Sequence, residues 1–276
     1  MPDTDPSSAS RPMRGMGERR FGRTNWLGLY TLIEREVRRF LSVWSQTVLA
    51  PVATSALFMV VFTIAFGSRR GEVQGVPFEQ FLAPGLLMMT VIQNAFANTS
   101  SSVMIAKIQG NIVDTLMPPL SAGEILVGYI AGGLIRGAVC AGVVMAVIFP
   151  WAGIAPQNVL WMLWFALSGS VMMGLLGLLA SIHAQRFDQM SAITNFVITP
   201  LSFLSGTFYS ISALPEAFRA VSHVNPFFYL IDGFRFGSIG VSDASPWTGL
   251  AVTLVVNVAL WLLALRWLQT GYKLKP

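Results

Sequence analysis

KIQGNIVDTLMPPLSAGE, residues 107–124, is a polar stretch that separates two long apolar runs of the chain. Three apolar side chains recur in it at every fourth position: Ile108, Ile112 and Leu116. In a helix they would share one face, and the Pro118–Pro119 pair would end that helix because proline lacks the backbone N–H. Residues 121–124, SAGE, then fit a capping box that starts the next helix. The pattern indicates either an amphipathic rod about 16 Å long on the membrane surface or an ordinary connecting loop.

The apolar runs around this stretch are long enough to cross a membrane. The 276-residue chain is 54% hydrophobic and 11% charged, whereas soluble domains carry about 25% charged residues. A helix of about 20 apolar residues crosses a hydrocarbon core of about 30 Å. The predicted fold class is therefore an all-α polytopic membrane protein with six transmembrane helices. The spans are predicted at about residues 45–66, 79–106, 125–149, 159–182, 190–209 and 246–268.

The segment before the first span, residues 26–44, is amphipathic. Its apolar stripe has three- and four-residue spacing and consists of Trp26, Tyr30, Ile33, Val37, Leu41 and Trp44. The charged residues 34–39 fill the opposite side, and Glu34 and Arg38 have the spacing of a favourable ion pair. Aromatic residues on one face and arginines on the other favour a helix in the membrane interface over a helix of a soluble subdomain. We expect a disordered basic tail over residues 1–25, a transmembrane domain over 26–270 and a cytoplasmic tail over 271–276.

Residues 211–241 are too polar and too broken to span. We expect two short helices that form a re-entrant hairpin, which the membrane tolerates only against protein or water. The candidate outer-gate residues of this hairpin are Pro215, Glu216, His223, Asn225, Pro226, Asp232 and Arg235. A membrane enzyme using Glu216, His223 and Asp232 is an alternative. Their spacing matches no catalytic arrangement, so a structural outer gate is favoured.

Lysines and arginines concentrate on one side of the predicted bundle, as they do on cytoplasmic faces. That side has the basic residues of both tails, of the 26–44 helix and of the loops containing Lys107 and Arg186. The opposite side has Arg69, Arg70, Arg219 and Arg235. Both termini and the 107–124 stretch are therefore predicted in the cytoplasm. The net charge is +5, and the basic residues flank the spans. They therefore indicate membrane lipids, and not nucleic acid, as a partner.

Polar side chains also occur inside the spans. Amides and hydroxyls fill residues 93–102 of the second span, where they are costly if they face lipid. They are expected to face either other helices, as interhelical hydrogen bonds, or a polar passage. Arg136 in the third span must pair or reach water, and a structural partner is favoured over a substrate contact. Four glycines of that span predict close helix approach: Gly128, Gly132, Gly133 and Gly137.

The sequence lacks the motifs that power transport or catalysis. It contains no GxxxxGK[ST], and none of its lysines follows a glycine-rich loop, which excludes a P-loop ATP site. No HExxH, no GxSxG and no cluster of metal ligands occurs. The spans have almost no carboxylates, which ion-coupled carriers usually need. We therefore expect no catalytic residue, metal or cofactor on this chain. An ion-coupled carrier or channel is the alternative to transport powered by a separate ATPase.

Five segments together resemble the ABC type-2 export permeases over residues 26–270. They are residues 32–39 (LIEREVRR), 81–87 (FLAPGLL), 107–124, 200–209 (PLSFLSGTFY), and the run from Leu214-Pro215 through Asn225-Pro226 to Asp232-Gly-Phe-Arg235. The chain looks like the multidrug-like, nodulation-factor and polysaccharide export permeases. The resemblance implies export of an amphipathic substrate, such as a lipid, glycolipid, polysaccharide or drug, across the bacterial inner membrane.

The resemblance also implies partners and site residues. Two permeases would form a homodimer, and separate P-loop subunits carrying ATP and Mg would bind its cytoplasmic side. The residues that match coupling positions are Glu34, Arg35, Glu36, Arg38, Lys107, Gln109, Gly110, Asn111, Asp114, Arg186 and Asp188. The family's pathway lies between the first, second and fifth spans, where the matching residues are Asn94, Phe96, Asn98, Asn195, Phe196, Phe203 and Tyr209. In the 107–124 stretch the polar side chains would contact the ATPase while Ile108, Ile112 and Leu116 hold the rod to the bundle.

Overall fold

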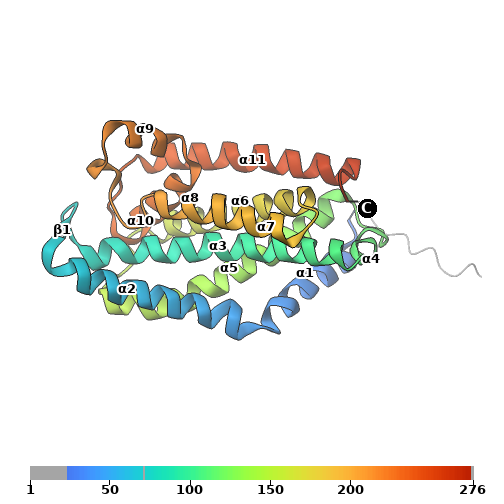
Figure 1. Ribbon diagram of the computed structural model, residues 1–276, viewed down its shortest axis with the longest axis horizontal. Helices are drawn as coiled ribbons and strands as arrows, with labels where there is room; N and C mark the ends of the chain where they lie inside the picture. The colour runs from blue at the N-terminus through green and yellow to red at the C-terminus, as the bar shows by residue number, and fades with distance from the viewer. Residues whose placement is uncertain (1–23, 71, 275–276) are drawn as a thin grey trace, which may run out of the picture.

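The computed structural model describes residues 24–70 and 72–274. Its long helices run along one axis of the molecule (Figure 1). They are α2 (Ala50–Arg70), α3 (Phe78–Ile108), α5 (Ala122–Ala152), α6 (Val159–His183) and α11 (Pro246–Thr270). The predicted all-α class is confirmed, because the described strands form only a two-stranded hairpin. The basic tail predicted over residues 1–25 lies outside the described residues, apart from positions 24 and 25.

Five helices in the described part of the chain are long and apolar enough to cross a membrane, and they match five of the predicted spans. The sixth, predicted at residues 190–209, consists of three consecutive segments: α7 (Phe187–Ile193), the π-helical η2 (Thr194–Ile198) and α8 (Thr199–Leu204). Pro200 lies in the first turn of α8, two residues after the end of η2. A second π-helical segment, η1 (Ser45–Leu49), precedes Pro51. Since proline cannot donate the regular helical hydrogen bond, both prolines coincide with altered helical turns.

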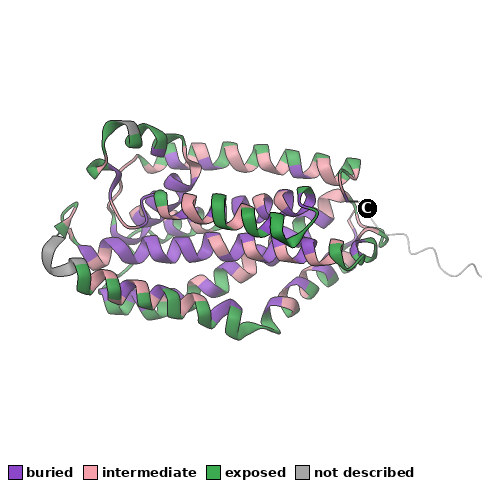
Figure 2. Cartoon of the chain, in the orientation of Figure 1, coloured by how far each residue is buried: buried purple, intermediate pink, exposed green. Residues whose placement is uncertain are grey.

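α3 forms the centre of the bundle, and most of its side chains are buried (Figure 2). It packs against α2, α5, α6 and α10 (Pro226–Ile239). Small residues bring these helices close together: a Cβ added to Gly177 of α6 would lie 2.7 Å from the Phe96 carbonyl oxygen of α3. Because other helices surround α3, an exposed side chain on α3 marks a gap between the neighbouring helices.

One end of the bundle, at the left in Figure 1, has a β-hairpin and short helices. The strands β1 (Glu72–Val73) and β2 (Val76–Pro77) pair antiparallel in the connection between the first two predicted spans. Gln74 and Gly75 between them both have positive φ, as a two-residue hairpin turn requires. Residues 211–241 form the two expected short helices, α9 (Glu216–Val224) and α10, after the single turn η3 (Ile211–Ala213). α10 packs among α3, α6 and α11.

The opposite end has the 107–124 stretch, and here the sequence prediction is partly wrong. α3 ends at Ile108, Gly110 takes a φ of +73°, and a separate short helix, α4 (Ile112–Leu116), follows. A left-handed residue stops a helix, so no single rod forms. Ile112 is buried as expected, but Ile108 is 48% exposed. The capping box is confirmed, because Ser121 Oγ accepts from the Glu124 N–H and Glu124 accepts from the Ser121 N–H.

α1 (Trp26–Leu41) crosses obliquely against α5 (Figure 1). Its buried positions are Leu29, Leu32, Glu36 and Phe40, while Trp26, Tyr30 and Trp44 are exposed. The sequence predicted the charges of this helix on the side away from its apolar stripe, and on that side Glu36 is fully buried. Two of the predicted glycines explain the contact. A Cβ on Gly128 would lie 2.4 Å from Leu32, and one on Gly132 would lie 2.6 Å from Glu36.

Candidate functional site

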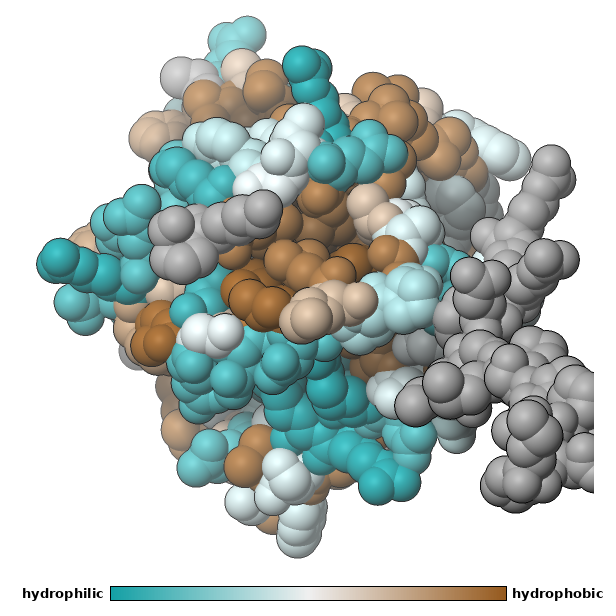
Figure 3. Space-filling model, turned by 90° about the vertical axis from the view of Figure 1, so that its right-hand side faces the viewer, coloured by the Kyte–Doolittle hydropathy of each residue, from teal (hydrophilic) through white to brown (hydrophobic). Residues whose placement is uncertain are grey.

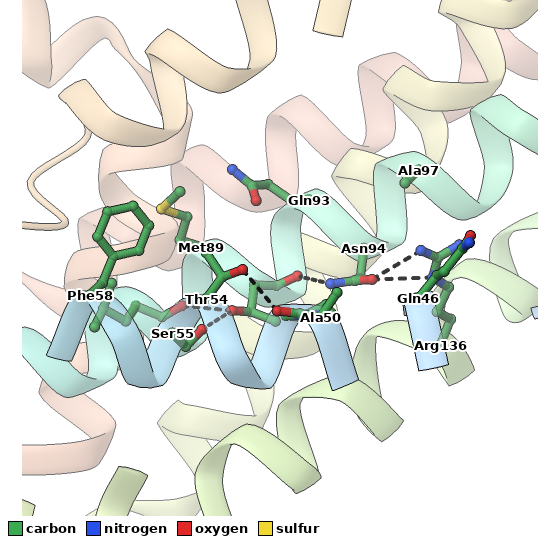
Figure 4. A pocket seen from close by; sticks show the side chains of 13 residues that line it. Gln46, Ala50, Thr54, Ser55, Phe58, Met89, Gln93, Asn94, Ala97 and Arg136 are labelled. Atoms are coloured by element: carbon green, nitrogen blue, oxygen red, sulfur yellow. Dashed lines mark hydrogen bonds between the residues drawn. The ribbon is translucent and has the colours of Figure 1, made fainter. Parts of the chain in front are cut away.

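A furrow runs along α3 between α2 and the α7–α8 segments. Within the buried part of α3, Gln93, Ala97 and Ser101 stay partly exposed, and their four-residue spacing puts them on one face. Two pockets of about 290 and 560 Å³ adjoin along this face. Both are lined by Thr54, Phe58, Met89, Gln93 and Ala97. We call the two pockets together the α3 furrow; Figure 4 shows the first of them, with Phe58 towards one end and Arg136 towards the other.

The furrow contains four of the seven predicted pathway residues. Asn94 lines the first pocket, and Phe96, Asn195 and Phe203 line the second. The other three lie elsewhere. Asn98 is fully buried in the bundle, and Phe196 is 81% exposed without lining either pocket. The Tyr209 hydroxyl donates to the Leu204 carbonyl oxygen, beyond the end of α8.

Asn94 faces both the furrow and the interior. Its Oδ1 accepts hydrogen bonds from Arg136 Nε (3.2 Å) and Nη2 (3.1 Å), and its Nδ2 donates to the Thr90 carbonyl oxygen (Figure 4). The hydroxyls of Thr90 and Ser55 share a hydrogen bond of 3.0 Å between α3 and α2. The polar residues of the second span therefore have two kinds of surroundings. Asn94 and Thr90 make hydrogen bonds within and between helices, while Gln93 and Ser101 face the furrow.

A second polar cluster joins α1 to α3. Glu36 Oε1 accepts from the Ser102 hydroxyl at 2.7 Å, and Glu36 Oε2 accepts from Arg39 Nη2 at 3.1 Å. Arg39 also donates to the Asn98 carbonyl oxygen and side chain and to Ser101 Oγ, which borders the furrow. Arg39 was not among the predicted coupling residues. Its position three residues after Glu36 was the available signal for an ion pair within α1.

α1 is also tied to the loop before α5. The Asn25 N–H donates to Glu124, the Asn25 side chain donates to the Pro119 carbonyl oxygen, and Arg35 Nη1 donates to Thr115 Oγ1 of α4 at 2.9 Å. These contacts surround a pocket of about 310 Å³, and we call this unit of α1, α4 and residues 117–124 the inner clamp. Figure 3 views the same end of the molecule, where hydrophilic residues surround a hydrophobic, hollowed centre.

Most predicted coupling residues are exposed near the inner clamp. The exposed ones are Arg35, Arg38, Gln109, Gly110, Asn111, Asp114, Arg186 and Asp188, and Glu34 is half-buried in an ion pair with Arg38. Two others are placed differently. Glu36 is fully buried, so none of its atoms faces a partner chain. The Lys107 ammonium donates to the carbonyl oxygens of Ser181, Ile182 and Ala184 at 2.7–3.0 Å, so it caps the C-terminus of α6.

Arg235 connects the elements at the end of the bundle with the β-hairpin, which the distribution of Lys and Arg predicts to be the outer end. It is 1% exposed and donates to the carbonyl oxygens of Gly206 (2.7 Å) and Phe81 (3.3 Å). The Asp232 carboxylate lies 3.8 Å away and accepts the N–H groups of Asp243 and Ala244. Burial raises the pKa of Asp232 to about 6, although Arg235 and those N–H groups favour the charged form.

The remaining outer-gate residues mainly shape the chain. Asn225 caps α10 and donates to Ser205 Oγ, Pro226 opens α10, and Pro215 directly precedes α9. Glu216 and His223 are exposed on α9, and within the described residues neither hydrogen-bonds to Asp232. The structure therefore does not assemble the three groups of the enzyme alternative.

Phenylalanines gather where α2 and α8 approach the outer end. Phe208 stacks on Phe62 with ring centres 4.7 Å apart and on Phe203 at 5.4 Å, and Phe58 packs edge-on against Phe203 and Phe208. Because Phe58 and Phe203 also line the furrow, this cluster borders its outer part. Of the four, only Phe203 was among the predicted pathway residues; Phe208 lies in the same segment, residues 200–209, and Phe58 and Phe62 lie in the apolar run of the first span.

Comparison with known proteins identifies the family. Residues 28–239 match the model of the ABC-2 type transporter family. The inner membrane transport permease YadH of Escherichia coli is 37% identical over 91% of this chain and 98% of its own length. Nodulation protein J of Sinorhizobium fredii is 26% identical over 76% of this chain and 80% of its length, and that of Rhizobium leguminosarum is 25% identical over 88% and 93%. With its apolar helices, the chain belongs to the ABC-2 type transporter family, as a multi-pass permease of the inner membrane.

Proposed function

We propose that this chain is the permease subunit of an ATP-driven exporter and that a separate P-loop subunit supplies the energy. The inner clamp carries this proposal. It presents a group of exposed polar and charged residues at one end of a chain that has no ATP-binding motif of its own. An ion-coupled carrier has less support, because none of the predicted pathway residues is a carboxylate.

In this proposal the chain crosses the membrane six times, with α7, η2 and α8 as the fifth span and both termini in the cytoplasm. The concentration of Lys and Arg near the inner clamp supports that orientation. Residues 211–241 form a re-entrant hairpin at the outer surface. The buried contacts of Arg235 support this role, because they attach α10 to the carbonyl oxygens of Phe81 in α3 and of Gly206, so that the hairpin rests against protein.

Two copies of the permease would place their α3 furrows face to face. Large apolar side chains on α2 and η2, next to the furrow, support this arrangement: Leu57 is 62% exposed, Ile64 76% and Phe196 81%. The furrow combines phenylalanine and methionine with amides and hydroxyls. That lining fits an amphipathic substrate with an apolar chain and a polar head.

Movement of the ATP-binding subunits would reach the furrow through two polar contacts. A displacement of α4 would move α1 through the hydrogen bond between Thr115 and Arg35. The movement of α1 would reach α3 through the hydrogen bonds of Glu36 and Arg39. Because Ser101 is bonded to Arg39 and borders the furrow, a shift of α1 changes the furrow wall.

Co-expression with a candidate P-loop subunit tests the proposal. The permease should co-purify with that subunit. Adding the permease to the isolated subunit should raise the subunit's rate of ATP hydrolysis several-fold. A permease that never binds such a subunit, and that transports an amphiphile in liposomes under an ion gradient alone, would contradict the proposal and support the carrier.

A further inference from the structure

Arg136 is a charged side chain in the middle of α5, and its partners are neutral. Its guanidinium bonds to the Asn94 amide oxygen and lies beside the Cys140 sulfur. Among the described residues no carboxylate forms an ion pair with it. A cation at this depth is costly unless it meets a counter-charge or water, which makes an unpaired one a candidate functional group.

The neighbouring charges do not neutralise Arg136. Glu36 is the nearby buried carboxylate, and it already pairs with Arg35 and Arg39. Arg39 lies close enough to add to the positive potential at Arg136. The region where α1, α3 and α5 meet therefore has more guanidinium than carboxylate groups.

Arg136 lines a pocket on the surface of the bundle. It lines the first pocket of the furrow, about 290 Å³ in volume, together with Gln46, Thr54, Gln93 and Asn94. Only two of its five N–H donors go to Asn94. Phe58, Met89 and Leu86 supply an apolar wall along the same pocket, and Figure 4 shows Phe58 at the far end from Arg136.

We propose that the furrow binds the anionic head group of a membrane amphiphile at Arg136, with the apolar chain along Phe58 and Met89. A phosphate or carboxylate would accept the free guanidinium N–H groups, and Gln46 and Gln93 would add neutral donors. Resting on the proposed exporter function, this assigns the cargo to the anionic amphiphiles. Neutral glycolipids and cationic drugs would lack the counter-charge that the pocket requires.

Binding can be measured on the purified full-length chain without an ATPase. The chain is held in neutral maltoside micelles, and its thermal unfolding is followed through its 8 tryptophans. The probes are didecanoyl phosphatidic acid, didecanoyl glycerol as its uncharged match, and inorganic phosphate as the free anion. We expect the acid to raise the unfolding midpoint saturably while the other two do not. Equal shifts with acid and glycerol would overturn the proposal, and a shift with phosphate alone would assign the pocket to a free anion.

Variants locate the site. Arg136→Gln keeps a donor for Asn94 but removes the charge, so affinity for the acid should fall roughly tenfold or more. Arg136→Lys should retain much of the affinity for the acid. Ala97 lines both pockets, so Ala97→Trp should block binding by filling the space between them. Arg266→Gln, which removes an exposed arginine from α11, is the control. Unchanged affinity in both Arg136→Gln and Ala97→Trp would contradict the assignment.

The cargo assignment has its own readout. In the reconstituted complex, phosphatidic acid should stimulate ATP hydrolysis with the wild-type permease but not with Arg136→Gln. Binding without stimulation would identify a resident lipid and overturn the cargo assignment. Failure of the acid to bind, in a permease that still co-purifies with its ATPase, would refute this inference alone and leave the exporter proposal intact.

Discussion

Glu36 places a full negative charge inside the contact between α1, α3 and α5. Two arginines and the Ser102 hydroxyl bond to its carboxylate. Removing one member of a buried ion pair leaves the others uncompensated, which costs more than the pair itself contributes. Glu34, two residues earlier, pairs with Arg38 at the surface, where an ion pair contributes little. The two glutamates thus differ in energy because they differ in burial.

Glu36→Ala should therefore lower the free energy of unfolding by about 3 kcal/mol, the lower end for a broken buried pair, because the half-buried Arg39 would lose its carboxylate partner. Glu34→Ala is the matched control and should cost about 1 kcal/mol or less. Denaturant unfolding of the purified permease measures both. Equal losses for the two variants would mean that the Glu36 cluster is exposed to solvent.

At the scale of elements, α1 packs against α5 through two glycines of α5 as well as through its own buried apolar side chains. Gly128 and Gly132 remove the side chains that would hold α1 away from α5. The same helix contacts α4 through Arg35. Its distance from α5 therefore sets the geometry of the whole inner clamp.

Gly132→Ile should displace α1 and destabilise the protein by about 1–3 kcal/mol, the usual cost of overpacking. Stimulation of a bound ATPase should fall with it, because the contact from α4 to α3 passes through α1. Gly142→Ile, in open space on the same helix, should change neither quantity. Thermal unfolding and ATP hydrolysis are measured on both variants, and equal effects would contradict this role for α1.

α4 offers a second test at this scale. Asp114 is exposed and forms no ion pair among the described residues. Asp114→Arg should reduce coupled transport about tenfold or more, because the reversed charge would repel the complementary charge on the partner subunit. The unfolding temperature should stay unchanged. Glu216→Arg, a charge reversal on α9 at the outer end, is the control. Wild-type transport in Asp114→Arg would remove α4 from the coupling surface.

At the scale of the whole molecule, the two ends of the bundle are built differently. One end has the inner clamp and its exposed polar residues, while the opposite end, the outer one in the proposed orientation, is held together by Arg235 and has a cluster of stacked phenylalanines beside the furrow. The furrow lies between them. This asymmetry fits a path that is entered from the inner side and closed at the outer side at rest.

Phe208→Ala should weaken the outer closure, since it removes two stacked pairs and one edge contact worth about 0.5–1.5 kcal/mol each. Proteoliposomes should then leak an amphiphilic dye several-fold faster without ATP. Phe218→Ala, on the exposed side of α9, should leave the leak unchanged. An unaltered leak in Phe208→Ala would show that another element closes the path.

Labelling tests the orientation of the molecule. Cys140 is the single cysteine and is buried, so a Cys140→Ala background is suited to introduced cysteines. An impermeant maleimide should label Glu216→Cys on intact cells, and it should label Asn111→Cys only after permeabilisation. Labelling of both from outside would refute the six-span topology with cytoplasmic termini.

Sequence by itself determined the long helices, the Ser121–Glu124 cap and the glycines of α5. These depend on apolar length and on contacts within a few residues, which are written locally in the chain. The order of the five quoted segments was also enough to indicate the family. The split of the 107–124 stretch escaped prediction, because it depends on the left-handed conformation of Gly110 within the three residues, 109–111, that separate α3 from α4.

Tertiary structure decided which polar groups are buried and what they meet. Glu36 and Asp114 are both acids on amphipathic helices, yet one is enclosed by α3 and α5 and the other is exposed. Arg136 faces Asn94 and the furrow because α3 passes beside α5, and the furrow exists because α2 and α7–α8 leave one strip of α3 uncovered. These features arise from contacts between segments far apart in the sequence. No periodicity within one segment specifies which helix becomes its neighbour.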